Sequence, residues 1–314
     1  MSSITPIEDK KRFNLFKVFI GSFRLMHFLQ VSTVTTIGTV IAILILKGSG
    51  TWSELFQNFS NGTISIAALI FFILTIFFQE AFCGVQNDYV DREIDQLYDK
   101  RRAIPDGWVS PKYAFGFGIF CFILFTAFSF VVGIWANTSY WGVLFIQGAN
   151  LIGIFYNLYA KHRPFSIVPY FFGFPLIPAY VWLTFGGFDP KYLWSIGLLI
   201  LVSFPAHIAN ELPDFDKDVE HNKRNFAVFL GKKLSTIIYW LGILLIEILI
   251  TIVYIIYSLN MIAYILTITL SLAVGLVAFL LMWKNNWETN FFIFNIITVC
   301  IGIETLGFFI MLGI

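Results

Sequence analysis

Acidic side chains are concentrated in two short stretches of this sequence. Eleven of the 19 Asp and Glu residues lie at 88–106 or 211–220. At an offset of 123 residues, NDYVDREID (87–95) aligns with NELPDFDKD (210–218). The paired positions are Asn87 with Asn210, Asp88 with Glu211, Asp91 with Asp214, and Asp95 with Asp218. A match of this kind indicates an internal duplication.

Two carboxylate clusters that face each other repel unless a cation lies between them. Carboxylate oxygens suit Mg²⁺, which binds one or two carboxylates together with substrate phosphates. No Cys/His spacing in the sequence indicates a zinc site. The candidate diphosphate ligands are the bases near both stretches, namely Lys100, Arg101, Arg102, Lys161, Lys223 and Arg224. Acidic residues that can bind metal, next to basic residues that can bind phosphate, predict a diphosphate site.

Helical geometry supports this chemistry in the first stretch. At about 100° per residue, the four polar positions of 87–95 fall on one face of a helix, within an arc of roughly 100°. The second stretch contains Pro213. Proline lacks a backbone N–H, so we expect the helix to kink or restart there.

The elements that position these residues are predicted to cross a membrane. Apolar residues make up 58% of the chain and charged residues 12%, which is too little polar surface for a soluble globule of this size. A spanning helix needs about 20 apolar residues, and nine such runs are present. They lie near 25–46, 64–86, 113–136, 139–160, 166–186, 192–209, 236–259, 260–283 and 290–313.

The basic residues predict the orientation of these spans. With nine spans, 18 of the 20 Lys and Arg residues fall on the side of the N-terminus, and only Lys47 and Lys191 lie opposite. The positive-inside rule places the majority side in the cytoplasm. That side holds the N-terminal segment 1–20 and the acidic loops 87–112 and 210–233. We therefore expect one domain, 1–314, in the cell membrane.

Several polar residues fall inside the predicted spans. Glu80, Glu247 and Glu304 lie at hydrocarbon depth, where carboxylates are costly and suggest function. Glu80 precedes Asp88 by two turns on about the same face, so it is a candidate cavity residue. His207 lies one turn before the second stretch, and its alternatives are an acceptor-orienting residue, a base, or a satisfied helix histidine.

These motifs give the chain a resemblance to the UbiA superfamily of intramembrane aromatic prenyltransferases. NDYVDREID is similar to the NDxxDxxxD motif of that family, and ELPDFDKD to its DxxDxxxD motif, with Glu211 in place of the leading Asp. The stretch Arg102-Ala103-Ile104-Pro105 resembles an Arg-Pro-Ile-Pro segment, with Ala103 for Pro. Tyr156 to Lys161 is similar to the family's Tyr…Lys pattern.

The resemblance implies an all-α fold of nine transmembrane helices around a central cavity. It implies transfer of a prenyl group from its diphosphate to a hydrophobic acceptor, through ionisation to an allylic cation. It implies that Asp88, Asp91, Asp214 and Asp218 are catalytic and that Tyr156 contacts substrate, and the positions of Glu80 and His207 on their helices add these two as candidate substrate contacts. The implied Mg²⁺ ligands are Asn87, Asp88, Asp91, Asp95, Glu211, Asp214 and Asp218.

Two other functions compete with this one. A cation transporter with acidic rings at its cytoplasmic mouth would carry charges along a central path, but the acids here gather at one membrane edge. A lipid-binding scaffold gives no reason for the matched repeat. A net charge of +1 without a basic arm does not indicate nucleic acid. The partners predicted are a prenyl diphosphate, an acceptor and the bilayer.

Overall fold

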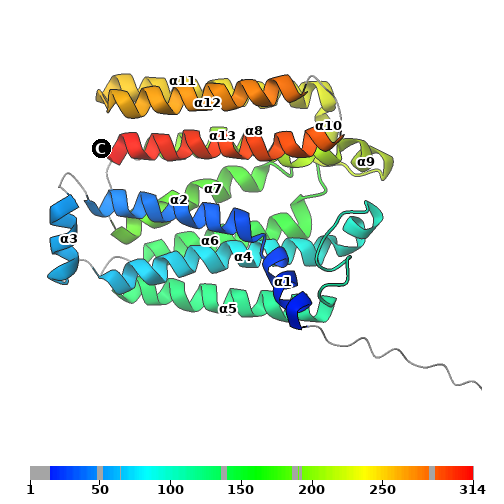
Figure 1. The fold of residues 1–314 in the computed structure, drawn as a ribbon, viewed down its shortest axis with the longest axis horizontal. Helices are drawn as coiled ribbons and strands as arrows, with labels where there is room; N and C mark the ends of the chain where they lie inside the picture. The colour runs from blue at the N-terminus through cyan, green and yellow to red at the C-terminus, as the bar shows by residue number, and fades with distance from the viewer. Residues whose placement is uncertain are drawn as a thin grey trace, which may run out of the picture.

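The computed structural model describes residues 15–47, 52–63, 65–135, 140–185, 190, 193–282 and 287–313. Throughout these residues the regular elements are helices, which confirms the all-α class. Most of the long helices run side by side along the long axis of the molecule, and a short helix, α3, crosses one end (Figure 1). Of the predicted N-terminal segment, residues 1–14 lie outside the described part. So do the predicted span ends at 64, 136, 139, 186, 192 and 283.

The helices follow one another with short connections. Their bounds are α1 Leu15–Leu25, α2 Phe28–Lys47, α3 Trp52–Ser60, α4 Ile66–Leu97, α5 Pro111–Trp135, α6 Trp141–Phe155, η1 Tyr156–Ala160, α7 Val168–Phe185, α8 Leu193–Glu211, η3 Leu212–Asp214, α9 Phe215–Glu220, α10 Phe226–Leu230, α11 Lys232–Tyr257, α12 Met261–Met282 and α13 Trp287–Gly313. Of these, η1 is a π-helix and η3 a 3₁₀-helix.

Seven helical stretches among the described residues are long and apolar enough to cross a membrane, and α1 with α2 makes an eighth. The ninth predicted span coincides with α13, which has 27 residues. Its described apolar stretch, Val299–Leu312, is shorter than a full span. The chain is therefore a multi-pass membrane protein, and nine spans remain a prediction.

The first predicted span, 25–46, differs from the structure. Helix begins earlier, at Leu15, and bends by 50° between α1 and α2. His27 lies in the bend with a left-handed φ of 52°. The unbroken apolar run hid this bend, because neither Gly nor Pro marks it.

The second predicted span, 64–86, is also too short. Ser65 caps α4 by accepting a hydrogen bond from the N–H of Ala68, and the helix continues to Leu97. Residues 87–97 are therefore helical, as the helix face predicted for 87–95 requires, and only the part of the predicted loop 87–112 that follows Leu97 lies outside α4. The charged face is buried, so the helix has no reason to stop where the apolar run ends.

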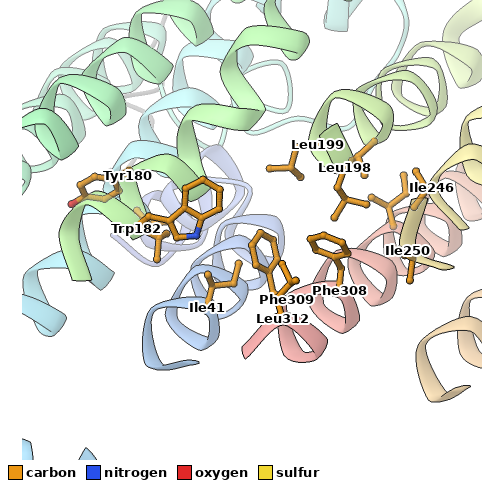
Figure 2. Close-up of a cluster of buried hydrophobic side chains, with 14 of the residues drawn as sticks. Ile41, Tyr180, Trp182, Leu198, Leu199, Ile246, Ile250, Phe308, Phe309 and Leu312 are labelled. Atoms are coloured by element: carbon orange, nitrogen blue, oxygen red, sulfur yellow. The ribbon is translucent and has the colours of Figure 1, made fainter. Parts of the chain in front are cut away.

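A hydrophobic core joins the two halves of the bundle. Figure 2 shows Ile41 of α2, Trp182 of α7, Leu198 of α8, Ile246 of α11 and Phe308 of α13 packed at their meeting point. Close helix approach supports this packing. At Gly242 of α11, an added Cβ would lie 2.8 Å from the Pro205 ring of α8. The core fixes α8 against α2 and α7, and so fixes the second acidic stretch at the end of α8.

Candidate active site

The first acidic stretch lies on the last three turns of α4. Asp88, Asp91 and Asp95 are 1%, 8% and 2% exposed, which agrees with the single helix face predicted for them. Burial of three carboxylates in one helix face is costly unless charged partners compensate. The neighbouring segments supply those partners.

The second stretch is broken where Pro213 predicts a break. Helix α8 ends at Glu211, the 3₁₀-helix η3 covers Leu212–Asp214, and α9 restarts at Phe215. Asp218 is buried and Asp214 is half-buried. Asp216 is exposed and pairs with Lys232 at 3.0 Å. Asp214 and Asp218, together with the buried Glu211, are therefore the inward acids of this stretch.

The internal repeat extends to the backbone. Asp99 and Asn222, which are 123 residues apart, both adopt the left-handed region, with φ of 53° and 57°. One residue further on, the N–H of Lys100 donates to the carbonyl of Asp95, and the N–H of Lys223 to that of Asp218, each at 2.8 Å. Both acidic helices thus end in the same type of cap.

The two acidic stretches contact each other directly. The ammonium group of Lys100 pairs with Asp214 and lies 3.8 Å from Asp95 Oδ1. The hydroxyl of Tyr98 donates to Asp218 Oδ1 at 2.8 Å. Burial and this hydrogen bond raise the pKa of Tyr98. Figure 1 shows the end of α4 and helix α9 at the same end of the molecule.

Four of the six predicted diphosphate ligands contact these acids. Besides Lys100, Lys161 pairs with Asp91 and bonds to the Asn87 side chain. Lys223 lies 3.0 Å from Asp218 Oδ1. Arg102 NH1 lies 3.6 Å from Asp88 Oδ1, and its Nε lies 3.9 Å from Asp95 Oδ2.

The other two predicted ligands, Arg101 and Arg224, are exposed. Neither forms an ion pair with an acid among the described residues. The carbonyl of Arg101 accepts a hydrogen bond from Arg24 of α1 at 2.9 Å. Arg101 and Arg224 therefore differ from Lys100, Arg102, Lys161 and Lys223, which lie among the acids.

A π-turn positions Lys161. In η1 the N–H of Lys161 bonds to the carbonyl of Tyr156, five residues back, at 3.0 Å. Asn157 in the same turn donates to Gln86 Oε1 of α4 at 3.1 Å. Single π-turns often occur at functional sites, and this one fixes the turn against α4 beside Asn87.

The buried acids offer oxygen donors of the kind that Mg²⁺ prefers. Asp88 Oδ2, Asp91 Oδ1 and Asp95 Oδ2 are buried without a hydrogen-bond partner among the described residues. Within that same part of the chain, no three His, Cys, Asp or Glu side chains converge as the ligands of one ion do. The carboxylate oxygens are of the kind that binds Mg²⁺. In this structure Lys100 pairs with Asp214 and Lys161 pairs with Asp91.

Glu211, predicted as a metal ligand, has both oxygens engaged. Its Oε2 accepts the N–H of Ala227 at 2.8 Å, and its Oε1 accepts the hydroxyl of Ser166 at 2.9 Å. His207 Nε2 lies 3.0 Å from the same Oε1.

The predicted substrate residue Tyr156 lies near this cluster, with its ring 6.0 Å from that of His207. Glu80 is half-buried on α4, within electrostatic range of Tyr170.

Sequence reasoning missed several residues of the site. His27 Nε2 lies 2.8 Å from Asp88 Oδ1, although nothing local marked it within its apolar run. Asn225 donates to Asp218 Oδ2 at 2.7 Å and accepts from the N–H of Val228. An Asn directly before a short apolar helix is a cap signal, so Asn225 could have been found. His162, next to Lys161, lies 3.8 Å from Asp91 Oδ1, and burial together with the charge of Lys223 lowers its pKa.

Together, the fold and site define a multi-pass helical membrane protein with two acidic stretches that meet at one end of the bundle. The model of the UbiA prenyltransferase family matches residues 51–297. The chain therefore belongs to the UbiA prenyltransferase family.

Curated relatives match part of this chain, and solved structures share its fold. The chain is 28% identical to digeranylgeranylglyceryl phosphate synthase of Pyrococcus horikoshii over 180 residues. These 180 residues make up 57% of this chain and 62% of that protein. The match thus spans less than two thirds of the relative. A solved digeranylgeranylglyceryl phosphate synthase has a similar fold, with a TM-score of 0.61 at 20% identity over 94% of this chain and 98% of the other.

A UbiA homologue from Archaeoglobus fulgidus, solved with GPP and Mg²⁺ bound, is similar to the same degree. Its TM-score is 0.61 at 18% identity, over 90% of this chain and 98% of that one. At this identity the likeness concerns the fold.

Proposed function

We propose that this protein transfers a prenyl group from a polyprenyl diphosphate to a lipid-biosynthetic acceptor in a Mg²⁺-dependent reaction. The observation that carries the proposal is the direct junction of the two acidic stretches through Lys100, Tyr98, Asp214 and Asp218. Three carboxylate oxygens of the first stretch, one each from Asp88, Asp91 and Asp95, have no hydrogen-bond partner among the described residues and lie on the same buried face of α4. Divalent metal in the family is supported by the Archaeoglobus homologue with GPP and Mg²⁺.

In this proposal the acidic residues bind metal and the basic residues bind the diphosphate. Asn87, Asp88, Asp91, Asp95, Asp214 and Asp218 are the candidate metal ligands. Bound Mg²⁺ would neutralise the charge that develops on the departing diphosphate. Lys100, Arg102, Lys161 and Lys223 lie among these acids and are placed to bind diphosphate oxygens. Tyr98 and Asn225 hold the Asp218 carboxylate in position from both sides.

The acceptor is proposed from the relatives. The Pyrococcus protein is named for a glyceryl phosphate product, so a phosphorylated glyceryl ether with a free hydroxyl is the first acceptor to test. Aromatic acceptors of the wider family are the second. The acidic end of the bundle would face the cytoplasm, because the basic side chains beside it follow the positive-inside rule.

The test uses purified protein in detergent with labelled geranylgeranyl diphosphate and a panel of acceptors. We expect a labelled prenylated product, and we expect EDTA to stop its formation. Asp91→Ala and Asp214→Ala should abolish turnover while the proteins stay folded. Asp216→Ala is the matched control, because Asp216 is exposed within the same stretch and should leave turnover unchanged. Full activity in Asp91→Ala would refute the proposed site.

A further inference from the structure

A buried polar cluster begins at Glu211 of the second acidic stretch and extends one turn deeper along α8 to His207. Ser166 and His207 are 0% exposed, and Glu211 is 6% exposed. Ser166 Oγ lies 2.8 Å from His207 Nε2 and 2.9 Å from Glu211 Oε1. The cluster joins the loop before α7, the end of α8 and the start of α10.

The hydrogen bonds of this cluster determine where the protons lie. Glu211 accepts from the N–H of Ala227 and from the hydroxyl of Ser166. Ser166 Oγ in turn accepts the N–H of Phe226 at 3.1 Å. The Ser166 proton is therefore directed at Glu211, and both atoms near His207 Nε2 are acceptors. Nε2 must carry hydrogen, which leaves the lone pair of a neutral imidazole on Nδ1.

Nδ1 of His207 is buried and has no hydrogen-bond partner among the described residues. A buried acceptor without a donor is costly, so such an atom suggests a ligand. The imidazole packs against Tyr170, with ring centroids 4.5 Å apart, and lies 6.0 Å from Tyr156. Both tyrosines are half-buried. The free nitrogen is therefore shielded from solvent, and the two rings that surround it are partly exposed.

The place of His207 along α8 matches the reacting end of the substrate. His207 lies one turn of α8, about 6 Å along the helix axis, before Glu211, where α8 ends and the segment that carries Asp214 begins. A diphosphate held at Asp214 and Asp218 would direct its prenyl chain toward the apolar interior. The first prenyl carbon, C1, and the attacking group would then lie deeper than the acids, on the side of His207.

We propose that His207, oriented by Glu211, is the general base that removes the proton of an acceptor hydroxyl; this inference rests on the proposed prenyl transfer. The acceptor O–H bond breaks and its hydrogen moves to Nδ1. The acceptor oxygen bonds to C1, and the C1–O bond to diphosphate breaks, with its electron pair leaving on the diphosphate. The imidazolium that forms keeps its Nε2–H toward the Glu211 carboxylate, which stabilises it.

The same geometry gives Glu211 a positioning role. With both oxygens occupied by Ala227, Ser166 and His207, Glu211 would position His207 rather than bind metal. Its extra methylene relative to Asp lets it bond to the start of α10, at Ala227, as well as to Ser166 and His207 on the other side. The acceptor class that follows is an alcohol or phenol with a free O–H, since a bare nitrogen lone pair recognises a donor.

The deciding variant is His207→Gln. The Gln amide can donate from the position of Nε2, so it keeps the contact with Glu211 and offers no basic nitrogen. With geranylgeranyl diphosphate and a glyceryl phosphate ether that has one free hydroxyl, we expect transfer to fall about 100-fold or more. Binding of the prenyl diphosphate should stay within threefold. His221→Gln is the control, because His221 is exposed and bonds only to the Lys217 carbonyl among the described residues.

Two further measurements separate a base from a structural residue. Added imidazole should restore part of the transfer in His207→Ala and none in His221→Ala. Glu211→Gln should slow transfer and leave the Mg²⁺ affinity unchanged, whereas a lost metal ligand would weaken that affinity. Wild-type transfer rates in His207→Gln would overturn the inference while leaving prenyl transfer intact. Wild-type protein that consumed no prenyl diphosphate would overturn both.

Discussion

Tyr98, the residue that follows α4, donates a hydrogen bond of 2.8 Å to the Asp218 carboxylate. The end of the first acidic stretch therefore holds a carboxylate of the second. The bond joins residues 120 positions apart, and Tyr98 is almost fully buried. It makes the two stretches one unit rather than two neighbouring charged surfaces.

Tyr98→Phe should loosen this unit without unfolding the protein. The pKa of Tyr98 is raised by burial and by its bond to Asp218, so the hydroxyl remains a donor throughout the working pH range. Without it, Asp218 keeps Lys223 and Asn225 but loses its tie to α4. We expect Mg²⁺ affinity, measured by calorimetric titration, to weaken roughly 10-fold, as for other residues that orient metal ligands.

Tyr89→Phe provides the comparison for this experiment. Tyr89 lies on the same helix and packs its ring against Phe115. Loss of its hydroxyl should leave Mg²⁺ binding at the wild-type level. Equal affinities for Tyr98→Phe and Tyr89→Phe would show that the cross-link has no part in metal binding.

Lys100→Met tests the competition between an ammonium group and a divalent cation. Lys100 lies between Asp95 and Asp214, so its removal leaves two carboxylates without their shared counter-charge. We expect the metal-free variant to lose roughly 1–3 kcal/mol of stability, seen as a lower melting temperature. Added Mg²⁺ should raise that temperature more than in wild type, because binding to the folded state stabilises it.

Lys112→Met is the matched control, since Lys112 is exposed at the start of α5. Both its metal-free melting temperature and its response to Mg²⁺ should equal those of wild type. A smaller response to Mg²⁺ in Lys100→Met than in wild type would mean that lysine assists the metal rather than replacing it.

Much of the site followed from local sequence patterns. The offset of 123 residues pairs Asp99 with Asn222, and the structure gives both the same left-handed backbone. The face of α4 and the break at Pro213 follow from helix geometry and from the chemistry of proline. The helix face and the break depend on residues a few positions apart, and the repeat is visible because the two copies share residue types at one offset, so both can be interpreted directly from the sequence.

The features that escaped prediction depend on distant contacts. The bend at His27 lies in an apolar run, and its contact with Asp88 spans 61 residues. The engagement of Glu211 by Ser166 and Ala227 needs three segments to meet. The loop predicted at 87–112 begins only after Leu97, because burial against cationic partners lets α4 continue. The sequence also could not distinguish the bases that contact the acids from those that do not. Only the folded chain shows that Lys100 and Lys223 pair with acids, whereas Arg101 and Arg224 are exposed.

The bend that carries His27 depends on Gly84 of α4. A Cβ at Gly84 would lie 3.0 Å from the Met26 carbonyl oxygen and 3.2 Å from that of Leu25. These are backbone atoms, so they cannot yield by rotation of a side chain. In Gly84→Val the bend must move away from α4, which draws His27 from Asp88. We expect a loss of roughly 1–3 kcal/mol, as for other overpacked sites, together with slower prenyl transfer.

Gly116→Val separates this effect from the general cost of valine in a helix. Gly116 lies in α5, and a Cβ there meets no atom within 4 Å. Thermal unfolding and prenyl transfer are measured on both variants in the same detergent. Only Gly84→Val should lose stability and activity, because only there does the new side chain displace backbone. If the two variants behave alike, the contact between α4 and the bend does not position His27.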